Sequence, residues 1–65
     1  MKIIINNKET IVEDDITVAE LLRQLNYKGW VAVIINGHML MEGGYENTIL
    51  MESDMVKIIK PLFGG

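Results

Sequence analysis

Gly64 and Gly65 are the last two residues of the sequence and the residues best suited to a chemical step. The four residues after Pro61 span at most about 14 Å, enough to hold an α-carboxyl group away from a folded domain. Without side chains, the glycines can enter a narrow channel in another protein. A terminal carboxyl group, with a pKa of about 3.5, is ionised at pH 7 and can attack the α-phosphate of ATP. We interpret Gly65 as the reacting group and Gly64 as the residue that lets it reach the active site of a partner. The alternative is a flexible chain end or an expression remnant.

The remaining polar residues predict no catalytic machinery. His38 is the only histidine, and no serine, cysteine or second histidine lies beside it in the sequence, as a general base or nucleophile would need. Asp14 and Asp15 are expected at a turn, without the roughly six to eight oxygen ligands of a calcium site. Gly43-Gly44 lacks the Lys-Ser/Thr that follows in a phosphate-binding loop. We therefore predict no bound cofactor and no metal.

Length and charge restrict the class of protein. A chain of 65 residues forms one domain and buries only about 60% of its unfolded surface, which disfavours an enzyme with its own cleft. Nine acidic and six basic residues give a net charge of −3, opposite to the basic face of a nucleic-acid-binding protein. No apolar run approaches the roughly 20 residues of a membrane span, and no signal-peptide pattern is seen. We expect a cytoplasmic protein with no nucleic-acid or membrane partner.

The hydrophobic pattern predicts several short strands and one helix. Thr17 and Glu20 have the spacing of a capping box, which marks the start of a helix. Apolar residues then recur on one helical face, at Val18, Leu21, Leu22 and Leu25. The strands are expected over residues 1–6, 9–13, 31–35, 38–40 and 55–59, with tight turns at Asn6-Asn7 and Asn36-Gly37. Residues 42–47 are predicted to form an irregular surface connection, and residues 48–50 a short strand or a turn.

This order of elements predicts an α+β protein with a β-grasp, or ubiquitin-like, fold. The helix must bury its apolar face on a mixed sheet of four to five strands, because no other surface is available. The helical crossover is long enough to make the last strand parallel to the first. Pro61 ends that last strand, since it cannot donate to the sheet. Residues 1–61 are therefore expected to form the domain, and residues 62–65 a flexible tail.

Side chains alternate between the two faces of a strand, and this alternation predicts an apolar surface. If Ile3, Val33 and Val56 face the helix, then Ile4, Ile34 and Ile59 face away from it, near Lys57. Apolar residues on an otherwise open sheet face are typical of a docking surface. Scattered surface isoleucines are the ordinary alternative. The methionines are expected mainly to fill the core.

The whole chain resembles the ThiS/MoaD sulfur-carrier family, and most closely its ThiS branch. The similar segments are Met1–Asn6, Thr17–Leu22, Val31–Gly37, Asp54–Ile59 and Gly64-Gly65. Three positions depart from the pattern: Glu52-Ser53-Asp54 replaces a common Asp-Gly-Asp, Asn7 replaces a common glycine, and Pro61 is unexpected. None of them is the reacting residue, although Pro61 bears on how the tail enters a partner.

The resemblance implies a carrier that is modified by other proteins and is not itself an enzyme. A ThiF/MoeB-type enzyme would use ATP to adenylate the Gly65 carboxylate, and a persulfide-derived sulfur would convert it to a thiocarboxylate. Thiazole synthase, ThiG, would receive that sulfur in thiamine biosynthesis. Leu62 and Phe63 would anchor the tail in an apolar groove of the partner, and the isoleucines of the open face would dock.

Other members of the β-grasp class remain as alternatives. A MoaD-like carrier would supply sulfur for molybdopterin or for another sulfur-containing product. A TGS-type module, or a plain ubiquitin-like interaction domain, would need no sulfur transfer and no free glycine pair.

Overall fold

The computed structural model describes residues 1–61, with the side chain of Glu42 excepted. It contains five strands and one α-helix in the predicted order, and a short 3₁₀ helix within the connection that was predicted to be irregular. They are β1 (Lys2–Ile5), β2 (Lys8–Ile11), α1 (Val18–Gln24), β3 (Ala32–Ile35), β4 (His38–Leu40), η1 (Glu42–Gly44) and β5 (Met55–Ile59). Residues 48–50 form a single bridge, between Thr17 and Ile49, and no strand.

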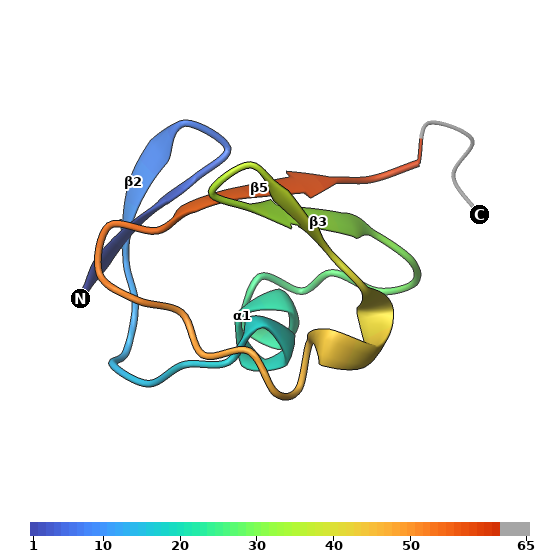
Figure 1. Cartoon of the computed structure of the whole chain (residues 1–65), viewed down its shortest axis with the longest axis horizontal. Coiled ribbons are helices and arrows are strands. Elements are labelled where there is room, and N and C mark those ends of the chain that lie inside the picture. The colour runs from blue at the N-terminus through green and yellow to red at the C-terminus, as the bar shows by residue number, and fades with distance from the viewer. Residues whose placement is uncertain (62–65) are drawn as a thin grey trace.

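The strands form one sheet in the order β2-β1-β5-β3-β4, and α1 lies across one face of it (Figure 1). β1 and β5 are parallel, whereas β1–β2, β3–β4 and β3–β5 are antiparallel. The last strand therefore occupies the centre of the sheet, between the first strand and the third. This mixed sheet with one helix is the β-grasp fold that the sequence predicts.

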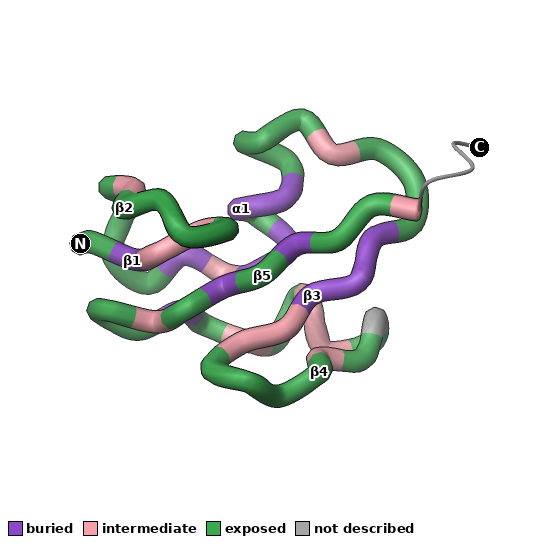
Figure 2. Tube along the Cα trace, turned by 90° about the horizontal axis from the view of Figure 1, so that it is seen from above, coloured by how far each residue is buried: buried purple, intermediate pink, exposed green. Residues whose placement is uncertain are grey.

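The core lies between α1 and the sheet. Figure 2 shows in purple the buried parts of the chain, which include parts of α1, β1, β3 and β5. Its largest fully buried side chains are Ile3, Leu21, Leu50, Val18 and Val33. The predicted alternation is confirmed along β5, where Val56 and Ile58 are buried and Met55, Lys57 and Ile59 are exposed. Leu25 was predicted on the buried helix face, but it is 40% exposed, because it is the C-cap residue where the helix ends.

The predicted capping box is present at the start of α1. The Thr17 hydroxyl oxygen accepts from the Glu20 backbone N–H at 3.1 Å, and Glu20 Oε1 accepts from the Thr17 N–H at 2.9 Å. Two further N–H groups of the first turn, those of Val18 and Ala19, donate to the carbonyls of Thr48 and Tyr45. The connection between β4 and β5 is therefore tied to the helix, and not only a surface loop as the sequence suggests.

The capping box predicts a specific loss of stability in acid. The bond from the Thr17 backbone, and then that from the Thr17 side chain, lower the pKa of Glu20 below its ordinary value of 4.5. A depressed carboxyl pKa stabilises the fold above pH 4.5, and the contribution disappears as pH falls from there through the folded-state pKa. We expect the melting temperature of the wild type to fall more steeply over this window than that of Glu20→Gln. Coincident curves for the two proteins would contradict this role.

Candidate functional site

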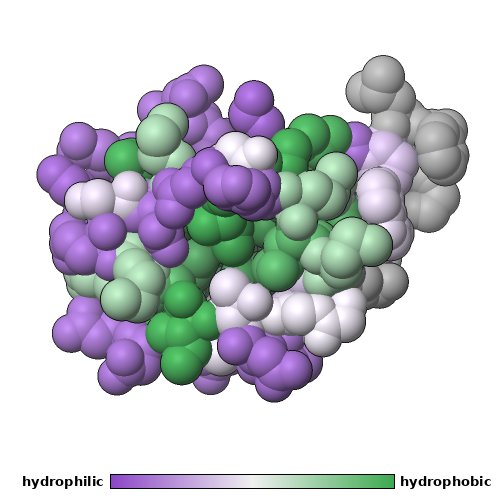
Figure 3. All heavy atoms as spheres, viewed as in Figure 1, coloured by the Kyte–Doolittle hydropathy of each residue, from purple (hydrophilic) through white to green (hydrophobic). Residues whose placement is uncertain are grey.

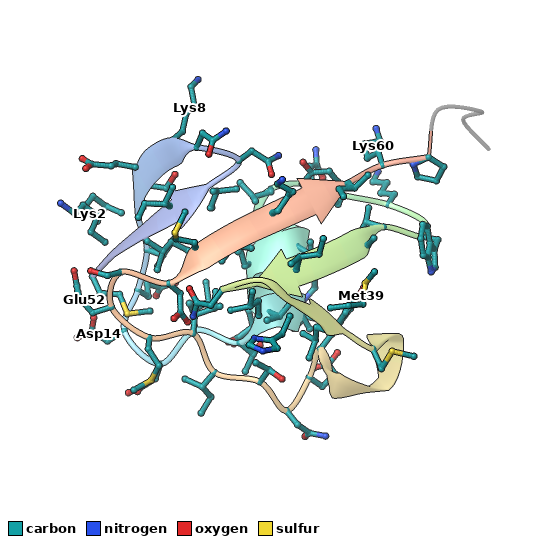
Figure 4. All side chains as sticks on the ribbon, turned by 45° about the horizontal axis from the view of Figure 1, so that its top comes forward. Lys2, Lys8, Asp14, Met39, Glu52 and Lys60 are labelled. Carbon is teal, nitrogen blue, oxygen red and sulfur yellow. The ribbon has the colours of Figure 1, made fainter. Side chains whose placement is uncertain are left out.

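The predicted reacting end lies outside the described residues. Gly64 and Gly65, and the predicted anchors Leu62 and Phe63, all belong to it. The structure does define what precedes them: β5 runs through the centre of the sheet to Ile59 and is followed by Lys60 and Pro61. Figure 4 shows Lys60 beyond the end of β5, at the opposite end of the sheet from Lys2 and Glu52. The strand that leads to the tail is thus held on both sides, by β1 and by β3.

Two of the three predicted docking residues come together on the open face of the sheet. Ile4 on β1 and Ile34 on β3 are half-buried and line one depression of about 230 Å³. Met55 and Lys57, from β5 between them, also line it. Ile4 is the parallel partner of Met55, and Ile34 is directly opposite Lys57. We call this hollow the open-face depression; its lining is mainly apolar, with one lysine and the asparagines Asn6, Asn7 and Asn36.

Ile59, the third predicted docking residue, lies on the same face but does not line the open-face depression. It is 44% exposed and stands two positions beyond Lys57 on β5. Its cross-strand partner on β3 is Ala32, which is buried and does not line the depression either. The predicted apolar spot therefore consists of a hollow at one end of β5 and a separate isoleucine near Pro61.

The exposure of Met55 on the surface was not predicted from the sequence. The methionines were expected mainly in the core, but Met39, Met41, Met51 and Met55 are between 55% and 74% exposed. The alternation of side chains along β5 does indicate this exposure, because Met55 shares the face of Ile59 and not that of the buried Val56. Hydrophobic residues also gather on the side shown in Figure 3, with hydrophilic residues around them.

Side-chain amides fasten both ends of β5. Asn36, after β3, accepts from the Met55 N–H at 2.9 Å and donates to Asp54 Oδ1 at 2.9 Å. Asn6, after β1, accepts from the Ile58 N–H at 2.8 Å and donates to the Ile58 carbonyl at 3.3 Å. Both asparagines have positive φ, 47° for Asn6 and 51° for Asn36. The sequence predicts them only as turn residues, since their contacts depend on strands distant in the chain.

The other candidates for chemistry remain isolated. Among the described side chains, no group of three His, Cys, Asp or Glu residues is placed to hold a metal ion. His38 is exposed at the start of β4. No helix within residues 1–61 is long and apolar enough to cross a membrane.

Comparison with known proteins identifies the family. The sequence model of the ThiS family matches residues 2–65. The chain belongs to the ThiS family. The crystal structure of the thiamine biosynthesis protein ThiS from Geobacter metallireducens superimposes with a TM-score of 0.86 at 28% identity, and each chain covers 100% of the other.

A solution structure of a thiamine biosynthesis protein from Geobacter metallireducens gives a TM-score of 0.82 at 28% identity, covering 100% of this chain and 88% of that one. No curated protein matches the sequence. The ThiS match confirms the resemblance and the β-grasp fold.

Proposed function

We propose that this ThiS-family protein is a sulfur carrier in thiamine biosynthesis, with the Gly65 carboxylate as its reacting group. One observation carries the proposal: the family match extends to residue 65 and so includes Gly64 and Gly65. The similar Geobacter structures, described as thiamine biosynthesis proteins, support the choice of pathway. The chain acts as a protein co-substrate and not as an enzyme. We propose that it works in the cytoplasm, without nucleic-acid or membrane partners.

The first step is activation by a ThiF/MoeB-type enzyme, which binds the ATP. A carboxylate oxygen of Gly65 attacks the α-phosphorus of ATP, and pyrophosphate leaves. The product is an acyl-adenylate, in which AMP has become a good leaving group. Gly64 and Gly65 allow this approach because they add no side chain to the tail.

The second step replaces AMP by sulfur. With sulfide, HS⁻ attacks the acyl carbon and AMP leaves, so that one carboxylate oxygen is exchanged for sulfur. With a persulfide donor, the first product is an acyl disulfide, and a thiol then cleaves it to the thiocarboxylate and a new disulfide. The thiocarboxylate delivers its sulfur to thiazole synthase, ThiG.

Recognition is assigned to the open face of the sheet and to the tail. The open-face depression would receive an apolar side chain of the activating enzyme, and Ile59 would extend the contact toward the tail. Leu62 and Phe63 are proposed to fill an apolar groove beside the nucleotide. Lys57, which is exposed beside Met55, favours an acidic group at the edge of the partner surface.

A reconstitution experiment tests the proposed function. The protein is incubated with ATP, a ThiF/MoeB-type enzyme from the same organism and sulfide, and its intact mass is recorded. Exchange of oxygen for sulfur makes the protein about 16 Da heavier. An unchanged mass with every such enzyme would favour a ubiquitin-like or TGS-type interaction module. A modified protein whose sulfur ThiG does not accept would indicate a MoaD-like carrier for another product.

Substitution of Ile59 tests the docking role of the open face. We expect Ile59→Glu to weaken binding to the activating enzyme about tenfold, because a charge replaces an apolar contact. Its unfolding midpoint should change little, since the side chain is 44% exposed. Ile49→Glu is the matched control, because Ile49 is 51% exposed and pairs with Thr17, away from the open face. Equal affinities of the two variants would remove Ile59 from the docking surface.

A further inference from the structure

The end of β5 has a hydrogen-bonding gap on one side. Asp54, just before β5, and the even-numbered residues of β5 direct their backbone groups toward β1. The N–H of Ile4 donates to the Asp54 carbonyl, and that of Asn6 donates to the Val56 carbonyl, both at 2.9 Å. If β1 continued in this pattern, the next pair in the series would join Lys8 to Ile58. The chain instead turns at Asn6 and Asn7, with φ of 47° and 70°, and Lys8 begins β2.

The Asn6 side chain fills this gap. Its carbonyl oxygen accepts from the Ile58 N–H at 2.8 Å, and its amide nitrogen donates to the Ile58 carbonyl at 3.3 Å. A side-chain amide carries the same donor and acceptor as a peptide group, so Asn6 extends β1 by one residue equivalent. Without it, two partly buried backbone groups would lose their partners. Ile58 is also only three residues before Pro61.

The opposite side of β5 is held differently. Ala32 and Val33 of β3 pair with Ile59 and Ile58, so β3 continues along the strand after β1 has ended. On the β1 side, backbone pairing joins β5 only at Met55 and Val56. The Asn6 amide is therefore the contact that keeps the last part of β5 in line with β1.

We propose that Asn6 is a positioning residue for the reaction at Gly65: by holding Ile58, it fixes the course of β5 up to Pro61 relative to the docking face. This inference rests on the proposed function. When an enzyme binds the open face, the carboxylate reaches its active site only if β5 keeps a fixed orientation relative to that face. Small displacements of a reacting group lower the rate of the chemical step strongly.

The test compares Asn6→Gly with Asn26→Gly. Asn26 also has positive φ, 67°, and glycine adopts positive φ without strain, so neither variant distorts the backbone. Asn26 is exposed after α1 and does not line the open-face depression, and among residues 1–61 its side chain forms no hydrogen bond, so Asn26→Gly is the matched control. The measured quantities are kcat and KM for the carrier in pyrophosphate release by a ThiF/MoeB-type enzyme, and the hydrogen exchange of the Ile58 amide.

We expect Asn6→Gly to lower kcat about 3- to 10-fold, with KM within about twofold of wild type. The Ile58 amide should exchange at least about tenfold faster in this variant. Asn26→Gly should match wild type in all three quantities. Equal kcat values for the two variants would overturn the proposal. A rise in KM alone would also overturn it, because loss of folded carrier raises the apparent KM and leaves kcat unchanged. If the wild type releases no pyrophosphate, the proposed function itself fails, and the variants are not needed to show it.

Discussion

Removal of Gly65 is expected to abolish thiocarboxylation while leaving the fold intact. Deletion withdraws the terminal carboxyl group by about 3.5 Å, and a misplacement of about 1 Å can already cost about 100-fold in rate. The unfolding midpoint should not change, because among residues 1–61 the buried core cluster runs from Ile3 to Ile58. Intact mass after incubation with the activating enzyme, ATP and sulfide measures the modification, and urea unfolding measures the stability.

Gly64→Ala is the matched comparison for this deletion. It keeps the length of the tail and adds one methyl group, so it tests the width of the channel separately from its reach. We expect partial modification of Gly64→Ala and none of the deletion variant. Modification of the deletion variant at the wild-type rate would show that the position of the terminal carboxyl group is not critical. A shifted unfolding midpoint would show that residue 65 contributes to the fold.

Truncation of Leu21 is expected to leave a large fraction of the protein unfolded at 25 °C. Leu21 is 1% exposed, and it belongs to the single core cluster shared by α1 and the sheet. Leucine-to-alanine changes at such sites cost about 2–5 kcal/mol. A core of this size supplies only about 3–5 kcal/mol of stability, so little remains after the change. Urea unfolding followed by circular dichroism gives the measurement.

Leu25→Ala makes the same chemical change on the same helix and serves as its control. Leu25 is 40% exposed at the C-cap, so we expect its substitution to cost less than about 1 kcal/mol. Similar unfolding midpoints for the two variants would contradict the assigned core.

The fold was predictable because local patterns and the global arrangement agree. The capping residues Thr17 and Glu20 identify where α1 begins, and both bonds of the capping box form. The period-two pattern of β5 identifies its buried face.

The backbone conformation explains two of the positions at which this sequence departs from the family pattern. Asn7 and Ser53, which stand where glycine is common, both have a φ of 70°, a conformation that favours glycine.

The site was predictable only in part, because its remaining contacts depend on register between distant strands. Ile4 and Ile34 follow from alternation alone, and they meet as expected. The roles of Asn6 and Asn36 do not follow from sequence, since each depends on where its strand stops beside β5. Alternation places Ile59 on the same face but does not show that it lies outside the depression.

The central claim, that the Gly65 carboxylate is the working group, is tested most directly by alkylation and fragmentation. The sequence contains no cysteine, so a thiocarboxylate would be the one thiol-like group for an alkylating reagent such as iodoacetamide. After incubation with the activating enzyme, ATP and sulfide, the account predicts one added label, carried by every C-terminal fragment that contains Gly65. Incubation without ATP should give no label. A label on fragments that exclude Gly65, or none at all, would contradict the account.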